Sequence, residues 1–122
     1  MPIKTETTSK ASFALVEKYG AAATVPYTSP TAGNTIKAST KGSLRHALDC
    51  ITTRESARCC FTALGRVDGR YAGLEYRDET WRTRKTVRVT MPLAYETFSR
   101  EVKLKGVYAR EADPSKFDLA VR

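Results

Sequence analysis

The segment from Trp81 to Met91 constrains the fold of this chain most, because its side chains alternate in character from residue to residue. One set of alternate positions turns apolar near its end and contains Thr83, Lys85, Val87, Val89 and Met91. The other set is wholly polar and contains Arg82, Arg84, Thr86, Arg88 and Thr90. Since successive side chains of a strand point to opposite faces, this period of two predicts a half-buried strand with a cationic outer face. Pro92 would end it.

Shorter strand-like segments precede this one and predict an antiparallel sheet. Residues 11–28 contain two runs of strand-forming residues around Lys18-Tyr19-Gly20, which is typical of an N-terminal hairpin. Residues 35–40 predict a further short strand. The Asp68-Gly69 pair is typical of a hairpin turn, after which residues 70–76 return as a strand.

Two regions allow both a helical and an extended interpretation. In residues 44–66, Leu44, Ala47, Leu48 and Ile51 fit one helical face, whereas Ile51-Thr52-Thr53 and Cys59-Cys60-Phe61-Thr62 favour strands. We predict strands at 45–54 and 57–66. After Pro92 an apolar helical stripe competes with an alternating Val102 to Lys105 segment, and these residues alone do not decide between them. Asp113 and Pro114 predict the start of a terminal helix over 114–121.

Charge and length restrict the class of protein. The 122 residues predict a single domain, and 21 Lys+Arg against 13 Asp+Glu leave a formal charge of +8, which favours a polyphosphate partner. No run is apolar enough to cross a bilayer and the N-terminus lacks the apolar core of a signal peptide, so we expect a soluble protein made in the cytoplasm.

Catalytic and metal sites find no support in the residue pattern. A single histidine, His46, and the cysteines Cys50, Cys59 and Cys60 lack the spacing of a zinc site, and we expect no disulfide within the chain. No nucleophile–base pair and no glycine-rich phosphate loop can be identified. We therefore expect no enzyme, no cofactor and no metal.

Several motifs, taken in order, resemble the coat proteins of single-stranded RNA bacteriophages, the levivirus family. They are Phe13-x-Leu15-Val16, the Val25-Pro26 strand with its Pro/Gly/Asn loop, Cys50 in a polar strand, and Trp81-Arg82-Thr83 followed by Thr90-Met91-Pro92. The resemblance implies an α+β fold in which residues 11–28 form a hairpin, residues 35–91 a five-stranded antiparallel sheet, and residues 94–122 two helices, the first at about 94–110. The short loop before Trp81 and Gly106 within the first helix depart from the family pattern.

The same resemblance implies the function of a capsid subunit. It implies an obligate homodimer that assembles into an icosahedral shell around genomic RNA, located in the virion or the bacterial host cytoplasm, with possible repression of translation through an operator hairpin. The expected RNA-binding residues are Arg82, Arg84, Thr86, Arg88, Thr90, Arg66 and Thr62, and the expected dimer or core anchors are Trp81, Phe98 and Val102. A small cellular RNA- or DNA-binding module is the alternative that would explain the charge equally well.

Overall fold

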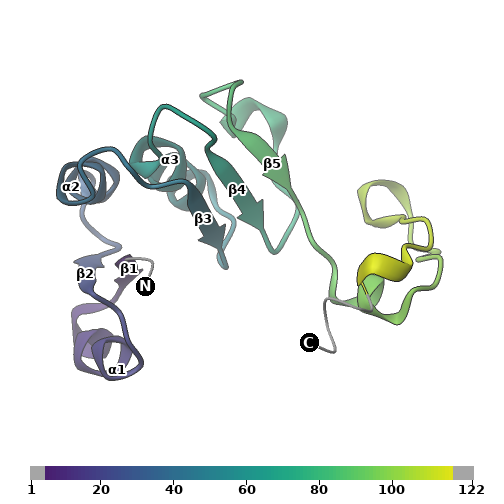
Figure 1. The fold of residues 1–122 in the computed structure, drawn as a ribbon, viewed down its shortest axis with the longest axis horizontal. Helices are drawn as coiled ribbons and strands as arrows, with labels where there is room; N and C mark the ends of the chain where they lie inside the picture. Colours follow the sequence, from purple (N-terminus) through teal and green to yellow (C-terminus); the bar gives the residue numbers. More distant parts are fainter. Residues whose placement is uncertain (1–4, 117–122) are drawn as a thin grey trace.

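The computed structural model describes residues 5–116, in which short helices alternate with short strands (Figure 1). In chain order the strands are β1 (Thr5–Thr8), β2 (Ala23–Pro26), β3 (His46–Asp49), β4 (Arg70–Gly73) and β5 (Arg88–Thr90). The α-helices are α1 (Phe13–Lys18), α2 (Ala32–Ser39) and α3 (Arg54–Ala63). Short 3-10 turns occupy Lys10–Ser12, Glu79–Trp81, Ala94–Phe98 and Gly106–Tyr108.

The strands form two small sheets in which every strand pair is parallel. β1 pairs with β2, and β3, β4 and β5 form a three-stranded sheet in that order. The register aligns Thr5 with Ala23 in the first sheet, and His46, Arg70 and Arg88 across the starts of the three strands in the second. Parallel neighbours require a crossover, which α1 and α3 supply between β1 and β2 and between β3 and β4.

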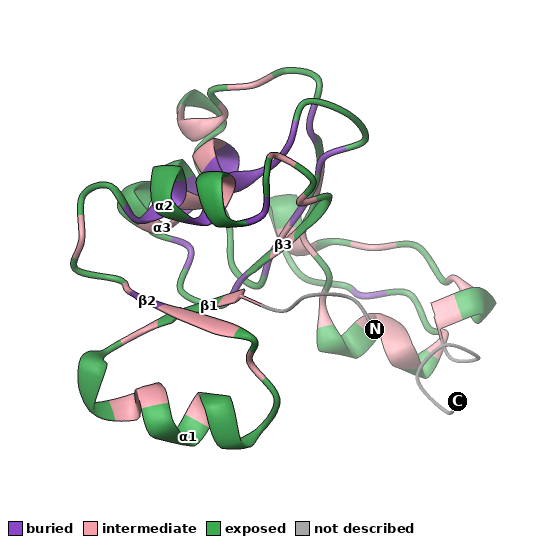
Figure 2. Cartoon of the chain, turned by 60° about the vertical axis from the view of Figure 1, so that its left-hand side comes forward, coloured by how far each residue is buried: buried purple, intermediate pink, exposed green. Residues whose placement is uncertain are grey.

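The core lies where α3 packs on the three-stranded sheet. Ala57, Phe61, Leu64, Tyr71 and Val87 form one buried cluster. A second cluster joins β2 and α2 to the end of α3 through Val25, Ala32, Ile36 and Ala63. In Figure 2 the buried residues concentrate around α2, α3 and the sheet, whereas α1 and most of the segment after β5 are half-buried or exposed.

Close packing of α2 against α3 depends on a glycine. A Cβ atom added at Gly33 would lie 2.7 Å from the main-chain oxygen of Cys59 and 2.9 Å from Cβ of Thr62. A side chain at this position would therefore force the two helices apart, so the close contact between α2 and α3 requires glycine here.

Several predicted elements differ from those observed. Residues 11–28 contain α1 and then β2, and β2 runs parallel to β1, so the predicted hairpin is wrong. Residues 35–40 lie in or just after α2, and residues 57–63 lie in α3, where strands were predicted. Strands were correctly predicted around 23–26, 46–49, 70–73 and 88–90, but each of them pairs with a parallel rather than an antiparallel neighbour.

The segment after β5 is not the predicted helix over 94–110. It contains a 3-10 turn at Ala94–Phe98, a bridge between Val102 and Arg110, and a second 3-10 turn at Gly106–Tyr108. Gly106 adopts φ +61°, a left-handed conformation that interrupts a helix. Residues 114–116 are helical, with Asp113 accepting from Ser115 at 3.0 Å, and the rest of the predicted terminal helix lies outside the described residues.

Candidate functional site

Asp49 organises the carboxyl end of β3, the edge at which parallel α/β sheets bind ligands. Its side chain is 3% exposed. One carboxylate oxygen accepts from the Ile51 and Thr52 amides at 3.1 and 2.9 Å. The other accepts from the Tyr71 hydroxyl at 2.8 Å and the Ser56 hydroxyl at 2.9 Å. A buried carboxylate held by four donors is a fixed structural centre, because none of its lone-pair directions needs solvent.

The turn that follows Asp49 leads directly into α3. Thr52 adopts φ +57°, an uncommon backbone conformation that the Asp49 carboxylate stabilises through the Thr52 amide. Thr53 then caps the helix: its hydroxyl accepts from the Ser56 amide at 3.2 Å, while Ser56 accepts from the Thr53 amide at 2.8 Å. This reciprocal capping box fixes the first turn of α3 relative to the end of β3.

Aromatic stacking joins Asp49 to the core. The Tyr71 and Phe61 rings lie 5.0 Å apart with an interplanar angle of 11°. The Arg77 guanidinium lies 5.8 Å from the Phe61 ring centroid and 5.9 Å from that of Tyr71, and it also pairs with Glu79 at 3.0 Å. Arg77 therefore keeps its charge compensated although the residue is only 6% exposed.

Burial changes the acidity of neighbouring groups. Desolvation, aided by the hydrogen bond to Asp49, raises the pKa of Tyr71 well above its usual range. Desolvation and the nearby Asp49 charge raise the pKa of Cys59, and the same causes raise that of Cys60 to about 12. All three groups are therefore neutral at physiological pH, and the two thiols are poor nucleophiles.

These shifts predict a loss of stability in alkali. An unfolded chain releases the Cys60 and Tyr71 protons near pH 8.5 and 10, whereas the folded chain retains them, so the free energy of unfolding falls as the pH rises above about 8.5. Tyr71→Phe should remove the part of this slope that begins near pH 10. Denaturant midpoints from pH 7 to 11 would measure the effect, with the 78% exposed Tyr19 replaced by phenylalanine as control. Equal slopes in Tyr71→Phe and wild type above pH 10 would contradict it.

The expected RNA-binding residues do not share a strand face. Only Arg88 and Thr90 lie in β5, while Arg82, Arg84 and Thr86 lie in the irregular segment before it. Arg84 donates to the Phe61, Leu64 and Gly65 carbonyls, and Arg82 donates to the Lys85 and Val87 carbonyls. Thr62 lies on α3 against Gly33, and Arg66 lies in the exposed α3–β4 connection. The two arginines before β5 therefore bind carbonyls of this chain.

The expected dimer or core anchors also divide. Trp81 is partly buried and packs against the Phe61–Tyr71 cluster, which fits a core role. Val102 is 8% exposed, and its amide and carbonyl pair with Arg110. Phe98 is 68% exposed within this chain.

Metal-binding and membrane-spanning features are absent from the part of the chain that the structure describes. Residues 5–116 bring no three His, Cys, Asp or Glu side chains together as metal ligands. Cys50, Cys59 and Cys60 are free thiols. None of the helices in the same range has the length and apolar character needed to span a bilayer.

Relatives of this chain are reductases. No protein-family model matches the chain. It is 43% identical over 105 residues to a trans-enoyl reductase of Macrophomina phaseolina (strain MS6), an alignment that covers 85% of this chain and 29% of that protein. It is 43% identical over 108 residues to one from Acremonium sp, covering 88% and 27%. A third, from Phaeosphaeria nodorum, is 42% identical over 114 residues, covering 92% and 31%.

These relatives overturn the expectations drawn from the coat-protein resemblance. Because the similar proteins are named reductases, the assignment to the levivirus family is wrong, and so are the capsid role and the expected absence of an enzymatic function. The expected RNA-bound obligate homodimer and the location in a virion or bacterial cytoplasm are wrong for the same reason. The motifs behind the coat-protein resemblance comprise only a few residues each, whereas the alignments with the reductases extend over 105 to 114 residues. The chain spans about a third or less of the length of the curated relatives it matches, and it is similar to trans-enoyl reductases along most of its own length.

Proposed function

We propose that this chain is the part of a trans-enoyl reductase that forms a nucleotide-binding α/β unit. The observation that carries the proposal is the parallel strand order together with the relatives' names. Strand–helix–strand units with parallel neighbours are the building blocks of doubly wound folds, which bind nucleotides at the carboxyl ends of their strands.

The arrangement of the two sheets favours a single larger sheet in which one additional strand joins them. Within the described residues β1 pairs only with β2, and β3 pairs only with β4, so β1 and β3 each leave one edge without a strand partner. A strand inserted between β1 and β3 would give the order β2, β1, new strand, β3, β4, β5. That sequence matches the common dinucleotide-binding order 3-2-1-4-5-6, with the inserted strand in first position. We propose that polypeptide corresponding to the remaining length of the relatives supplies it.

A reductase of this type would use a hydride carrier such as a nicotinamide dinucleotide. The residues present fit one part of such a molecule. The glycine-rich turn that cradles a pyrophosphate follows the first strand of the fold, and none of the described turns after β1, β3 or β4 contains it. The turn after β1 holds Ser9, Lys10 and Ser12 and no carboxylate, and Ser9 and Lys10 are exposed. A cation with hydroxyls at the end of the second strand suits a ribose 2′-phosphate rather than a free 2′-hydroxyl.

A chimera tests the proposal with the whole fold present. Residues 1–122 replace the matching segment of the Macrophomina reductase, to which they are 43% identical over the aligned residues. We expect the chimera to reduce the enoyl substrate of that reductase with consumption of NADPH. Lys10→Glu in the chimera should raise the KM for NADPH about tenfold and leave that for NADH within about twofold, since only NADPH presents the phosphate.

The controls separate loss of function from loss of fold. Lys18→Glu makes the same charge change at an exposed position outside the turn and should leave both KM values unchanged. A chimera that melts cooperatively at the temperature of the parent reductase, yet neither binds NADPH nor reduces the substrate, would overturn the proposal.

A further inference from the structure

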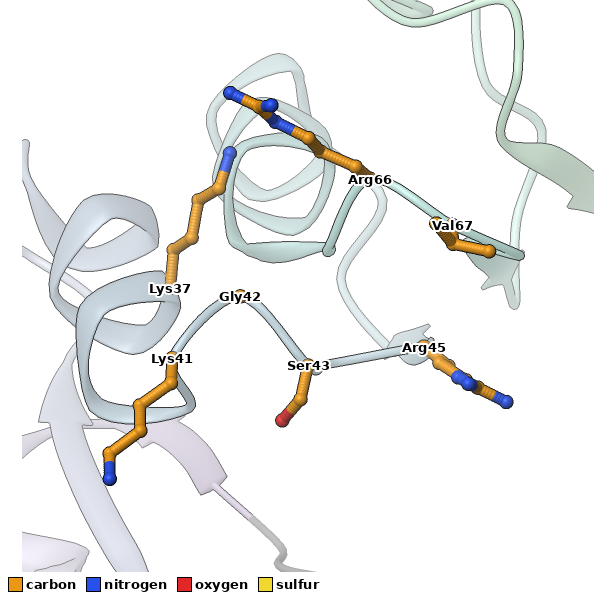
Figure 3. A pocket seen from close by; sticks show the side chains of 7 residues that line it. All are labelled: Lys37, Lys41, Gly42, Ser43, Arg45, Arg66 and Val67. Atoms are coloured by element: carbon orange, nitrogen blue, oxygen red, sulfur yellow. The ribbon is translucent and has the colours of Figure 1, made fainter.

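A basic hollow lies at the amino-terminal edge of the sheet, opposite the edge that carries Asp49. Its walls come from the end of α2, the Lys41–Arg45 connection to β3, and the start of the α3–β4 connection (Figure 3). The lining residues are Lys37, Lys41, Gly42, Ser43, Arg45, Arg66 and Val67, around a volume of about 410 Å³. Volumes of this size hold small ligands.

The two connections that form the hollow are fixed to one another through their backbones. The Gly65 amide donates to the Leu44 carbonyl at 2.7 Å. A Cβ atom at Gly65 would lie 2.2 Å from the Gly42 carbonyl oxygen, so only glycine permits this approach. The hollow is therefore a defined feature of the fold rather than a gap between loose loops.

Four cations line the hollow without an acidic residue among them. Within residues 5–116 the ion pairs join Arg77 to Glu79, Lys103 to Glu101 and Arg110 to Glu96, so none involves the lining lysines and arginines. In Figure 3 the Lys37 and Arg66 side chains extend toward the same space, although like charges repel. Such an arrangement is stabilised when an anion lies between the cations.

The helix ends nearby explain only part of this charge. The carboxyl ends of α2 and α3 both lie at the hollow. The Arg84 guanidinium already covers the end of α3 by donating to the Phe61 and Leu64 carbonyls, so only the end of α2 contributes, with about half a negative charge. This end offsets about half of one cation among the four, which leaves an excess above about three. The backbone amides of Lys41, Gly42 and Ser43 already donate to the Ala38, Lys37 and Thr40 carbonyls, so the side chains supply the attraction.

We infer that this hollow binds a multiply charged phosphate anion, of the size of a di- or triphosphate group. Lys37 and Arg66 contact the phosphate oxygens from two sides, and Lys41 and Arg45 add charge at the rim. Arginine and lysine form strong charge-assisted bonds with phosphate, and a chain of two or three phosphates carries enough charge to balance the excess. The hollow lies away from the carboxyl edge of the strands, so this inference does not depend on the proposed reductase function.

The experiment uses inorganic tripolyphosphate as the probe and the 122-residue chain as the protein. Titration calorimetry at 50 and 200 mM salt should show saturable one-to-one binding that weakens with salt. The double variant Lys37→Glu/Arg66→Glu should lose at least about tenfold in affinity. The control Lys18→Glu/Arg100→Glu makes the same change in net charge at exposed positions outside the hollow and should lose less than about threefold.

A second measurement uses only the wild-type chain, so its result does not depend on whether the double variant folds. In the wild-type chain, bound tripolyphosphate should slow acetylation of Lys37 and Lys41 relative to that of Lys18. Equal losses in the two double variants would show attraction by net charge alone and overturn the inference. Binding of a polyglutamate peptide without binding of tripolyphosphate would overturn it in favour of an acidic protein surface.

Discussion

Replacing Asp49 by alanine is expected to lower the free energy of unfolding by about 3 kcal/mol, because it removes the acceptor of four hydrogen bonds at once. The Tyr71 hydroxyl and the Thr52 amide are buried and lose their partner, and each unsatisfied donor costs about 1–3 kcal/mol. Thr52 also loses the contact that supports its positive φ. Urea denaturation followed by circular dichroism would show the effect as a lower midpoint with an unchanged slope.

Two variants make this expectation specific to the buried carboxylate. Asp49→Asn keeps one acceptor oxygen and should lose less than Asp49→Ala. Glu111→Ala removes an exposed carboxylate and should stay within about 0.5 kcal/mol of wild type. If Asp49→Ala were as stable as Glu111→Ala, the carboxylate would not hold the turn between β3 and α3.

The sequence contained the signals for α3, but strand propensity obscured them. Cys59-Cys60-Phe61-Thr62 favours a strand by residue type. The Thr53 and Ser56 capping pair and the buried positions 57, 61 and 64 instead follow helical spacing, and they decide the outcome because α3 closes the core. Had the Thr53 and Ser56 pair been interpreted as a helix cap, the sequence would have predicted α3 and drawn attention to Asp49, the buried carboxylate that precedes it.

The alternation from Trp81 to Met91 predicted a strand only in part. Residues 88–90 pair with β4, but the preceding residues leave the sheet. Arg82 and Arg84 are polar residues of this alternating pattern, and in the structure they bind main-chain carbonyls. An alternating pattern of polar and apolar residues does not distinguish that role from exposure to solvent. A long-range contact between residue 84 and residues 61–65 carries no local signal, so the cationic face could not be tested by pattern.

The direction of the strands relative to one another could not be predicted from the sequence, and this led to the incorrect prediction of an antiparallel sheet. Interpreting residues 35–40 and 57–63 as strands removed the helices α2 and α3, of which α3 is the crossover between β3 and β4, and without crossovers a series of short strands suggests an antiparallel meander. The apolar positions Ala32 and Ile36, four residues apart, are buried against Val25 and Ala63. That spacing is helical, whereas the strand interpretation followed the residue types of the 35–40 segment and not the spacing of its buried positions.

Arg84→Ala is expected to destabilise the chain by about 3 kcal/mol, a large loss for an arginine. Its guanidinium donates to the Phe61, Leu64 and Gly65 carbonyls at 3.1, 2.7 and 2.7 Å, so it satisfies acceptors at the end of α3 and joins them to the segment before β5. Such carbonyls have no partner within their own helix, and a cation there also offsets the helix dipole.

Matched variants separate this capping role from simple positive charge. Arg84→Lys keeps the charge but has no planar fork to reach three acceptors, so it should recover only part of the loss. Arg88→Ala removes an exposed arginine whose side chain makes no hydrogen bond or ion pair with the described residues, and it should change stability by less than about 0.5 kcal/mol. Thermal and urea unfolding of the three variants would decide the matter. Equal stability of Arg84→Ala and Arg88→Ala would mean that the contacts of Arg84 with the three carbonyls do not fasten α3 to the segment before β5.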